Sequence, residues 1–313
     1  MSEELEIKFM ARANLKDELA KFINENNIAL LKREELKLNN RYFDTPSSDL
    51  FKNGIALRVR QTNSQFEMTI KTKDKGQGGL FIHPEYNISL DEDVAIPNLS
   101  KFPPEIFTSL NLNEIQSNLK ENMSQRCNRT IFLINFKETT IEISLDDVFY
   151  FSPKGEINSK ELELELKEGN KQELIEFSLL LIKNLPNHSL FLGTLSKMQR
   201  AAFYATLSKA PKIIESNENE TNPQTIMRAI ERNELNFLLT HEKVALENYI
   251  QYIEQLIKFS NNQNAQFLEI LRSNLNYLNK EMKNFSEKEL NNLLLDLISD
   301  KEYLYARSQY IFN

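Results

Sequence analysis

Charged side chains repeat with a period of two in several short segments, and within a segment they often share one sign. Glu161, Glu163 and Glu165 form a row of carboxylates, whereas Arg58 and Arg60 form a pair of cations. Residues two apart in a β-strand point to the same face, roughly 7 Å from each other. Carboxylate rows suit hard divalent cations, and arginine pairs suit a polyanion because one guanidinium group can bind two oxygens.

The same spacing recurs elsewhere, with Glu4, Glu6 and Lys8 on one face, Lys71 with Lys73, and Glu142 with Asp146. The opposite faces of these segments are mostly Leu, Ile or Val. A polar face turned toward water would explain any single segment. Like charges on one strand repel each other, however, unless a ligand of opposite charge lies between the strands. The set of segments therefore predicts a shared, charge-lined site.

The elements that must position these side chains are short strands. Their alternation of apolar and polar residues is the strand period, and it is clearest in five segments, Glu4–Lys8, Ile55–Arg60, Phe66–Lys71, Thr140–Asp146 and Glu161–Leu166. Turn signals lie at 76–79 and 153–155. Helical patterns cover 14–24, with Asn14 as the expected N-cap, and 171–183.

An antiparallel barrel with its polar face inward would collect the charged rows in one place. About eight strands leave an interior just wide enough for side chains and one small ligand. The helical segments would then cover the apolar outer face. We therefore predict that residues 1–206 form an α+β domain built on a closed barrel with a charged tunnel.

The remainder of the chain has a different pattern. Residues 207–222 read as a linker, since Ser216–Asn222 contains no apolar residue. Residues 223–313 contain no glycine and show helical periodicity, with a capping box at Ser286 and Glu289. They predict a small all-α bundle of four or five helices.

Composition narrows the function classes. The net charge of −7 disfavours a nucleic-acid partner, and the apolar runs are too short to cross a bilayer. The acidic start is unlike a signal peptide, and Cys127 is the single cysteine, so we expect a cytoplasmic protein. His83, His188 and His241 are far apart, which argues for packing or surface roles and against zinc. No P-loop motif occurs.

The order of the charged motifs resembles that of the CYTH, or triphosphate tunnel, family. The resemblance covers about residues 1–206 and is closest to bacterial inorganic triphosphatases that carry a helical CHAD-type domain after the barrel. The helical part here is shorter and holds one histidine, so it is expected to be a reduced relative of CHAD. The matching elements are Glu4-Leu-Glu6-Ile-Lys8, Tyr42-Phe43-Asp44-Thr45-Pro46, Leu57-Arg58-Val59-Arg60, Thr69-Ile70-Lys71, Arg129, Glu161-Leu162-Glu163-Leu164-Glu165 and Ser196-Lys197.

The resemblance implies hydrolysis of inorganic triphosphate to pyrophosphate and phosphate, with Mg²⁺ or Mn²⁺ as one or two bound ions. One ion would neutralise and orient the phosphates, and a second would present the attacking water. The implied catalytic residues are Glu4, Glu6 and Lys8. The implied phosphate-binding residues are Lys8, Arg58, Arg60, Lys71, Lys73, Arg129 and Lys197. The implied metal ligands are Glu4, Glu6, Asp146, Glu161, Glu163 and Glu165.

Other interpretations remain open at this point. The same scaffold serves thiamine or nucleoside triphosphatases and class IV adenylyl cyclases. A module that binds polyphosphate or nucleotide without catalysis is a second class, and the helical part could then contact a protein or polyphosphate. A generic α+β protein that has lost function is a third. The carboxylate rows argue against pure anion capture, which needs cations alone.

Overall fold

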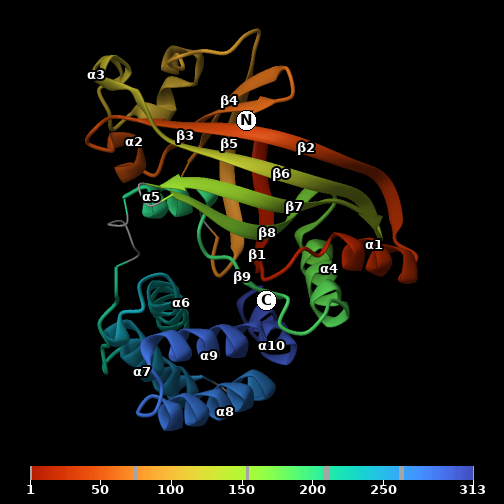
Figure 1. Cartoon of the computed structure of the whole chain (residues 1–313), viewed down its shortest axis with the longest axis vertical. Helices are drawn as coiled ribbons and strands as arrows, with labels where there is room; N and C mark the ends of the chain where they lie inside the picture. The colour runs from red at the N-terminus through yellow and green to blue at the C-terminus, as the bar shows by residue number, and fades with distance from the viewer. Residues whose placement is uncertain (1, 73–75, 153–154, 207–211, 261–263, 313) are drawn as a thin grey trace.

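The computed structural model describes residues 2–72, 76–152, 155–206, 212–260 and 264–312. Within these residues the strands form one antiparallel sheet in the order β5-β4-β3-β2-β6-β7-β8-β1-β9. β1 also pairs with β5, so eight strands close into a barrel (Figure 1). The strands are β1 (Ser2–Ala11), β2 (Ala29–Asp44), β3 (Ala56–Thr62), β4 (Gln65–Lys71), β5 (Leu80–Leu90), β6 (Lys120–Phe136), β7 (Thr139–Ser152), β8 (Gly155–Glu168) and β9 (Leu190–Leu192).

The five segments with strand periodicity lie in β1, β3, β4, β7 and β8, and the predicted closed barrel is confirmed. The turn expected at 76–79 joins β4 to β5, where Gly78 and Gly79 have φ of 59° and 89°. Such positive values favour glycine. In the second expected turn, Pro153 and Lys154 lie outside the described residues.

The barrel is apolar outside and polar inside. Helices α1 (Lys16–Glu25) and α4 (Lys171–Asn184) cover the outer face around β1, β7 and β8, where Phe177 and Ile143 are fully buried. A second cover over β2–β5 consists of two 3₁₀ turns and the helices α2 (Asp49–Lys52) and α3 (Leu112–Asn118). These layers take up the apolar faces of the strands, which leaves their charged faces to line the interior.

The N-cap expected at Asn14 is wrong. Helix α1 begins at Lys16, its N-cap position is Leu15, and no side chain caps it there. The Asn14 Oδ1 atom instead accepts a hydrogen bond from the Lys16 N–H at 3.0 Å. Leu15 is buried in the core beneath the helix, so packing of this apolar side chain fixes where the helix starts.

One side of the barrel is covered by α5 (Lys197–Thr206). This helix packs on β6 and β7, and Ala201 joins a small apolar cluster with Leu38, Cys127 and Val148. Tyr150 of β7 packs against Tyr204 of the helix, with ring centroids 5.3 Å apart. The first residue of α5 therefore stands at the edge of the barrel interior.

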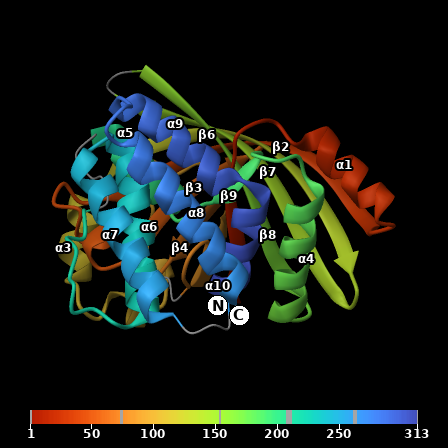
Figure 2. The same ribbon diagram turned by 90° about the horizontal axis from the view of Figure 1, so that it is seen from below.

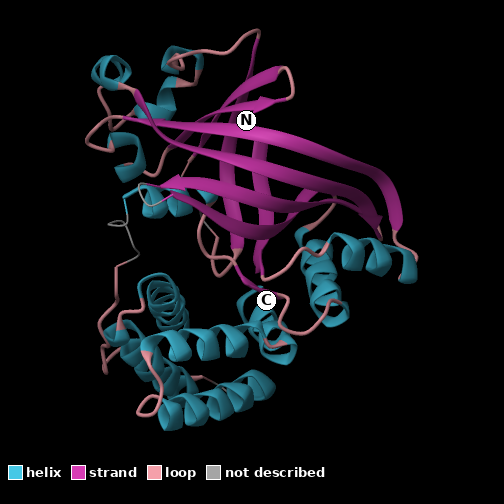
Figure 3. Cartoon of the chain, viewed as in Figure 1, coloured by secondary structure: helices cyan, strands magenta, loops and turns pink. Residues whose placement is uncertain are grey.

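The C-terminal part of the described chain is helical (Figure 3), in line with the expected bundle. Asn222 caps the first helix by accepting from the Gln224 and Thr225 N–H groups, and the capping box of Ser286 and Glu289 is present. None of the described helices has the length and apolar character needed to cross a membrane. The helices are α6 (Pro223–Thr240), α7 (Lys243–Phe259), α8 (Ala265–Glu281), α9 (Glu287–Ser299) and α10 (Lys301–Phe312).

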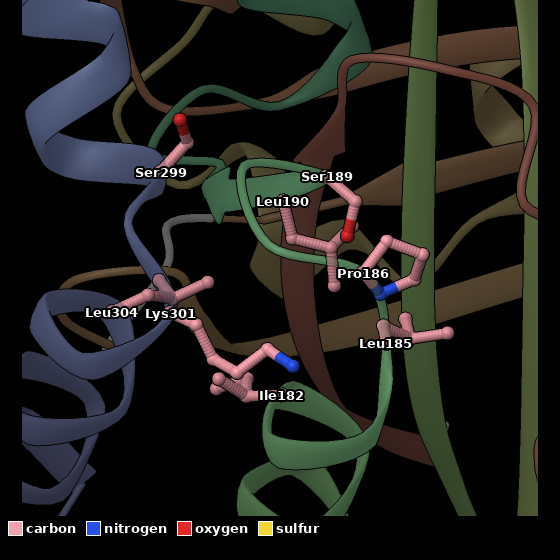
Figure 4. A pocket seen from close by; sticks show the side chains of 8 residues that line it. All are labelled: Ile182, Leu185, Pro186, Ser189, Leu190, Ser299, Lys301 and Leu304. Atoms are coloured by element: carbon pink, nitrogen blue, oxygen red, sulfur yellow. The ribbon is translucent and has the colours of Figure 1, made fainter.

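This helical region is packed firmly onto the barrel. Helix α10 lies beside α4 (Figure 2), and its Leu304 and Phe312 belong to the same apolar cluster as β1 and β8. The space between the end of α4, β9 and the start of α10 is a cavity of about 10 Å³ (Figure 4), room for one water at most. Arg12 adds an ion pair to Asp296 at 2.6 Å.

Candidate active site

The barrel encloses a cavity of about 860 Å³, within the range of about 300–1,000 Å³ typical of small-molecule sites. Period-two alternation in β1, β3, β4, β6 and β8 turns the charged residues toward it. The sequence-predicted site residues that line the cavity are Glu4, Glu6, Lys8, Arg58, Arg60, Lys71, Arg129, Glu163, Glu165 and Lys197. Lys73 lies outside the described residues.

Glu163 is the centre of an ion-pair network on one wall. Its carboxylate accepts from Lys8 Nζ at 2.8 Å, from Arg129 Nη2 at 2.9 Å and from Lys197 Nζ. Burial alone would raise its pKa, but Lys197, Lys8 and Arg129 outweigh that effect and hold the pKa well below the usual range. Glu163 therefore stays ionised and fixes three cations at the cavity wall.

Asp146 and Glu161, which were predicted as metal ligands, are bound to cations of the protein itself. Neither lines the cavity, and both are buried beneath the start of α5. Asp146 accepts two hydrogen bonds from Arg129, at 2.7 and 2.6 Å, and an ion pair from Lys197 at 2.9 Å. Glu161 lies 3.2 Å from Lys197 Nζ and accepts from the Tyr150 hydroxyl at 3.0 Å. In this arrangement the two carboxylates orient cations.

Three other carboxylates face the cavity and have fewer cations close to them than Glu163 has. Glu4 forms an ion pair with Lys71. Burial would raise the pKa of Glu4, but the positive charge of Lys71 outweighs that effect and lowers the pKa. Burial raises the pKa of Glu6, whose nearest cation, Lys8, lies 3.6 Å away. Burial also raises the pKa of Glu165 to about 7 despite the ion pair with Lys167 at 2.7 Å, and repulsion from Glu4 adds to the rise. Glu4, Glu6 and Glu165 therefore form a crowded carboxylate group in which the nearby lysines do not offset the rise in the pKa values of Glu6 and Glu165.

The arginines of β3, Arg58 and Arg60, have the opposite imbalance of charge, because few carboxylates lie near them. Burial lowers the pKa of Arg60 to about 10, and repulsion from Arg58 and Arg129 contributes. Arg60 donates to the neutral Asn40 Oδ1 at 2.9 Å, and the nearest carboxylate to Arg58 is Glu85 at 4.0 Å. The buried Nε of Arg58 has no hydrogen-bond partner in the described part of the chain. Two adjacent guanidinium groups short of negative charge suit an anionic ligand.

The donor chemistry of the carboxylate group fits a hard divalent cation. Oxygen ligands are those that Mg²⁺ and Mn²⁺ prefer, and a cation would offset the burial and the carboxylate repulsion that raise the pKa values of Glu6 and Glu165. As the side chains stand, no three His, Cys, Asp or Glu residues among those described are arranged as a metal site.

Sequence reasoning missed several lining residues. His83 was expected to be a surface or packing residue, yet it is buried at the cavity wall, with Nδ1 3.1 Å from the Thr72 carbonyl oxygen. Thr69 and Glu67 line the cavity because they share a strand face with Lys71, and Asn87 is opposite Thr69 on β5. Arg232 reaches the cavity from α6, which no local pattern indicates. In β6 the predicted residue Arg129 faces inward, whereas Arg126, three residues earlier, pairs with Glu156 outside.

The chain belongs to the CYTH domain family, whose model matches residues 2–202. It is 30% identical over 204 residues to the inorganic triphosphatase of Haemophilus influenzae, covering 64% of this chain and 54% of that protein. The chain thus spans about half the length of this curated relative.

Solved structures are more distant. The Hippeastrum protein HpAC1, described as having a dominant triphosphatase activity, has 19% identity and a TM-score of 0.46, covering 66% of this chain and 98% of that one. The Mimivirus capping enzyme triphosphatase has 18% identity and a TM-score of 0.33, covering 56% and 87%. The fold is established by the strand pairing described above and does not depend on these distant similarities.

Proposed function

We propose that the protein hydrolyses inorganic triphosphate to pyrophosphate and phosphate with the help of a divalent cation. The observation that carries the proposal is the pairing of two imbalances within one cavity. The arginines of β3 lack negative charge, and the positive charge of Lys8 and Lys167 does not offset the burial and carboxylate repulsion that raise the pKa values of Glu6 and Glu165. A metal complex of a polyanion supplies both, which neither a free anion nor a free cation would do.

Charge balance explains why the polyanion needs the cation. Among the described lining residues, the basic and acidic side chains are nearly equal in number. The described basic ones are Lys8, Arg58, Arg60, Lys71, Arg129, Lys167, Lys197 and Arg232, and the described acidic ones are Glu4, Glu6, Glu67, Glu85, Glu142, Glu163 and Glu165. A triphosphate carries several negative charges, so it would be repelled by the carboxylates unless a divalent ion lay between them.

Arg58 and Arg60 would bind phosphate oxygens through their planar guanidinium forks. Lys8, Arg129 and Lys197 are already oriented by Glu163 and Asp146, so they present fixed donors to charge that develops on the phosphate. Lys71 pairs with Glu4 and would share that role with Lys73. Phosphoryl transfer needs mainly positioning and charge neutralisation, which this arrangement supplies without a covalent nucleophile.

Glu4, Glu6, Glu163 and Glu165 would hold one or two Mg²⁺ or Mn²⁺ ions. Such an ion would supply Lewis-acid polarisation of a phosphate oxygen and lower the pKa of a bound water. Glu4, Glu6 and Lys8 are the proposed catalytic residues because they combine the crowded carboxylates with a buried cation on one strand face. Asp146 and Glu161 would act indirectly by positioning Arg129 and Lys197.

We also propose a cytoplasmic location without a nucleic-acid partner. The single, buried Cys127 suits a reducing cytoplasm, and the acidic net charge argues against nucleic acid. We further propose that the helical region is a reduced relative of CHAD. The family match ends at residue 202 and leaves this region out.

The test is phosphate release from tripolyphosphate with Mg²⁺, with Mn²⁺ and with chelator. The double variant Glu4→Gln/Glu6→Gln should lose metal-dependent release. Glu3→Gln is the matched control, because Glu3 is an exposed neighbour on the same strand and should leave the rate unchanged. Product analysis with ATP and thiamine triphosphate separates the other triphosphatases and the cyclase. Absence of release from every triphosphate with either metal would refute hydrolysis and leave a binding module.

A further inference from the structure

Helix α6 contributes an arginine to the cavity of the barrel. Arg232 is part of the cavity lining, although it lies in the helical region and the other described lining residues belong to the barrel and the start of α5. Its side chain is exposed to solvent. Within the described ranges, no hydrogen bond or ion pair engages its guanidinium group, so the group is available to a ligand.

The position of Arg232 is fixed by packing around its neighbour. The adjacent Glu231 is buried, and it lies so close to the β4–β5 turn that a Cβ on Gly78 would be 2.7 Å from its Oε1 atom. The same Cβ would be 2.6 Å from Ile311 of α10. Only a residue without a side chain allows α6 and α10 to approach the turn this closely. The contact holds the middle of α6 against the barrel.

The rest of the helical region prevents α6 from swinging away. Helix α10 packs against α4, with Leu304 and Phe312 in the same buried apolar cluster as Phe177 and Leu181, and Leu304 lies beside Ile182 at the small cavity in Figure 4. Arg307 of α10 is buried and donates a hydrogen bond to Glu234 of α6 at 2.7 Å. This bond holds α6 to α10, the helix that packs on the barrel. Arg232 is therefore a preorganised cation, and little conformational freedom of the helix is lost when it binds a ligand.

The charge of Arg232 discriminates between two kinds of triphosphate. An inorganic chain carries negative charge at both ends, whereas a nucleoside triphosphate has a neutral sugar and base beyond one end. On the proposed function, the arginines of β3 and Lys71 bind phosphates within the barrel. A solvent-exposed arginine of α6 at the same cavity is then placed to contact the part of the ligand that these residues leave free.

We propose that Arg232 binds the outer terminal phosphate and makes the site select polyphosphate chains over nucleoside triphosphates. This inference rests on the proposed function. It assigns the helical region a direct part in substrate choice, because the barrel alone would lack this contact. The contact would be the same in the bound substrate and in the transition state, so it acts on KM and leaves kcat nearly unchanged.

The experiment compares Arg232→Gln with Arg228→Gln in the full chain. Arg228 lies one turn earlier on the same helix and is also exposed, but it does not line the cavity. Steady-state kinetics are measured with tripolyphosphate and with ATP. We expect Arg232→Gln to raise KM for tripolyphosphate about tenfold, the size of one charged hydrogen bond, with kcat/KM for ATP unchanged. Arg228→Gln should change neither substrate.

Calorimetric binding of non-hydrolysable imido analogues of tripolyphosphate and ATP in the presence of Mg²⁺ tests the inference without turnover. The same tenfold loss, restricted to tripolyphosphate and to Arg232→Gln, supports it even if the wild type proves inactive, an outcome that would refute hydrolysis alone. Equal losses for both ligands, an equal effect of Arg228→Gln, or no effect of Arg232→Gln would each overturn it. The first two would indicate a general surface field, and the third an arginine that touches no ligand.

Discussion

Asp146 and Asp147 are neighbours on β7 with opposite surroundings, and replacing each by asparagine tests the buried ion network. Asp146 is completely buried and accepts from Arg129 and Lys197 at 2.6 to 2.9 Å. Asp146→Asn keeps the shape but removes one buried charged partner from both Arg129 and Lys197, which retain only their ion pairs to other carboxylates such as Glu163. Breaking a buried pair in this way costs about 3–5 kcal/mol of unfolding free energy.

Asp147→Asn is the matched control. Asp147 points to the outer face and pairs with Lys160 at 3.3 Å, with both side chains more than a third exposed. Screening by water limits such a pair to about 0.2–1 kcal/mol. Urea unfolding at pH 7 in EDTA measures both losses. With a urea dependence of about 3 kcal/mol per molar, the midpoint should fall by about 1 M or more for Asp146→Asn.

The pH dependence of this difference has a defined sign. Burial would raise the pKa of Asp146, but Arg129 and Lys197 outweigh it and lower the pKa from 3.8 to about 2. A carboxylate with a depressed folded pKa contributes stability that is complete above pH 3.8 and is lost as pH falls toward 2. This part amounts to about 2 kcal/mol, so wild type and Asp146→Asn should converge over that window. Equal losses for the two variants at pH 7, or a difference that does not shrink in acid, would refute the reasoning.

Two further predictions follow from the site and from the turn beside α6. The pKa of Glu165 is about 7, so it is mostly protonated at pH 6 and ionised at pH 8. The Mg²⁺ concentration for half-maximal phosphate release should therefore fall severalfold between these pH values, and Glu165→Gln should flatten the dependence. Gly78→Ala should lower the thermal midpoint by more than Gly155→Ala does. Both have positive φ, but only the Cβ at Gly78 meets neighbouring atoms, at a cost of about 1–3 kcal/mol. Equal midpoints for the two variants would contradict this.

The strand period was enough to predict the barrel wall. Alternation puts Glu4, Glu6 and Lys8 on one face and Arg58 with Arg60 on another, and sheet closure then brings these faces together. The choice of Arg129 over Arg126 follows from the same period, since residues three apart point to opposite faces of a strand. These predictions depend only on the alternation of side chains along each strand, which is a local property of the strand.

Depth along the barrel could not be predicted in this way. Glu161 and Glu165 share one face of β8, yet Glu161 is buried under α5 while Glu165 faces the cavity. The difference arises from where α5 packs, which is a contact between segments far apart in the sequence. Arg232 was missed for the same reason, because its place depends on how α6 packs against Gly78.

The N-cap at Asn14 shows a local signal overruled by packing. Asparagine is a favoured cap, but Leu15 occupies the cap position because its side chain fills the core below α1. Propensity at a helix end is worth about 1 kcal/mol, and burying a leucine side chain is worth about 2 kcal/mol. The larger effect decided the start of the helix.

The pairing of β1 also determines when the site can form during synthesis. Lys8 is opposite Glu163 on β8, so the strand that carries three proposed catalytic residues waits for a partner made more than a hundred residues later. At about 5–20 residues per second, that interval is on the order of 10 s on the ribosome. During this time the apolar face of β1, with Ile7 and Phe9, cannot yet pack into the core that it shares with β8 and α4. Long-range closure of this kind is slow, so catalytic activity should appear only with the final folding step and would report barrel closure directly.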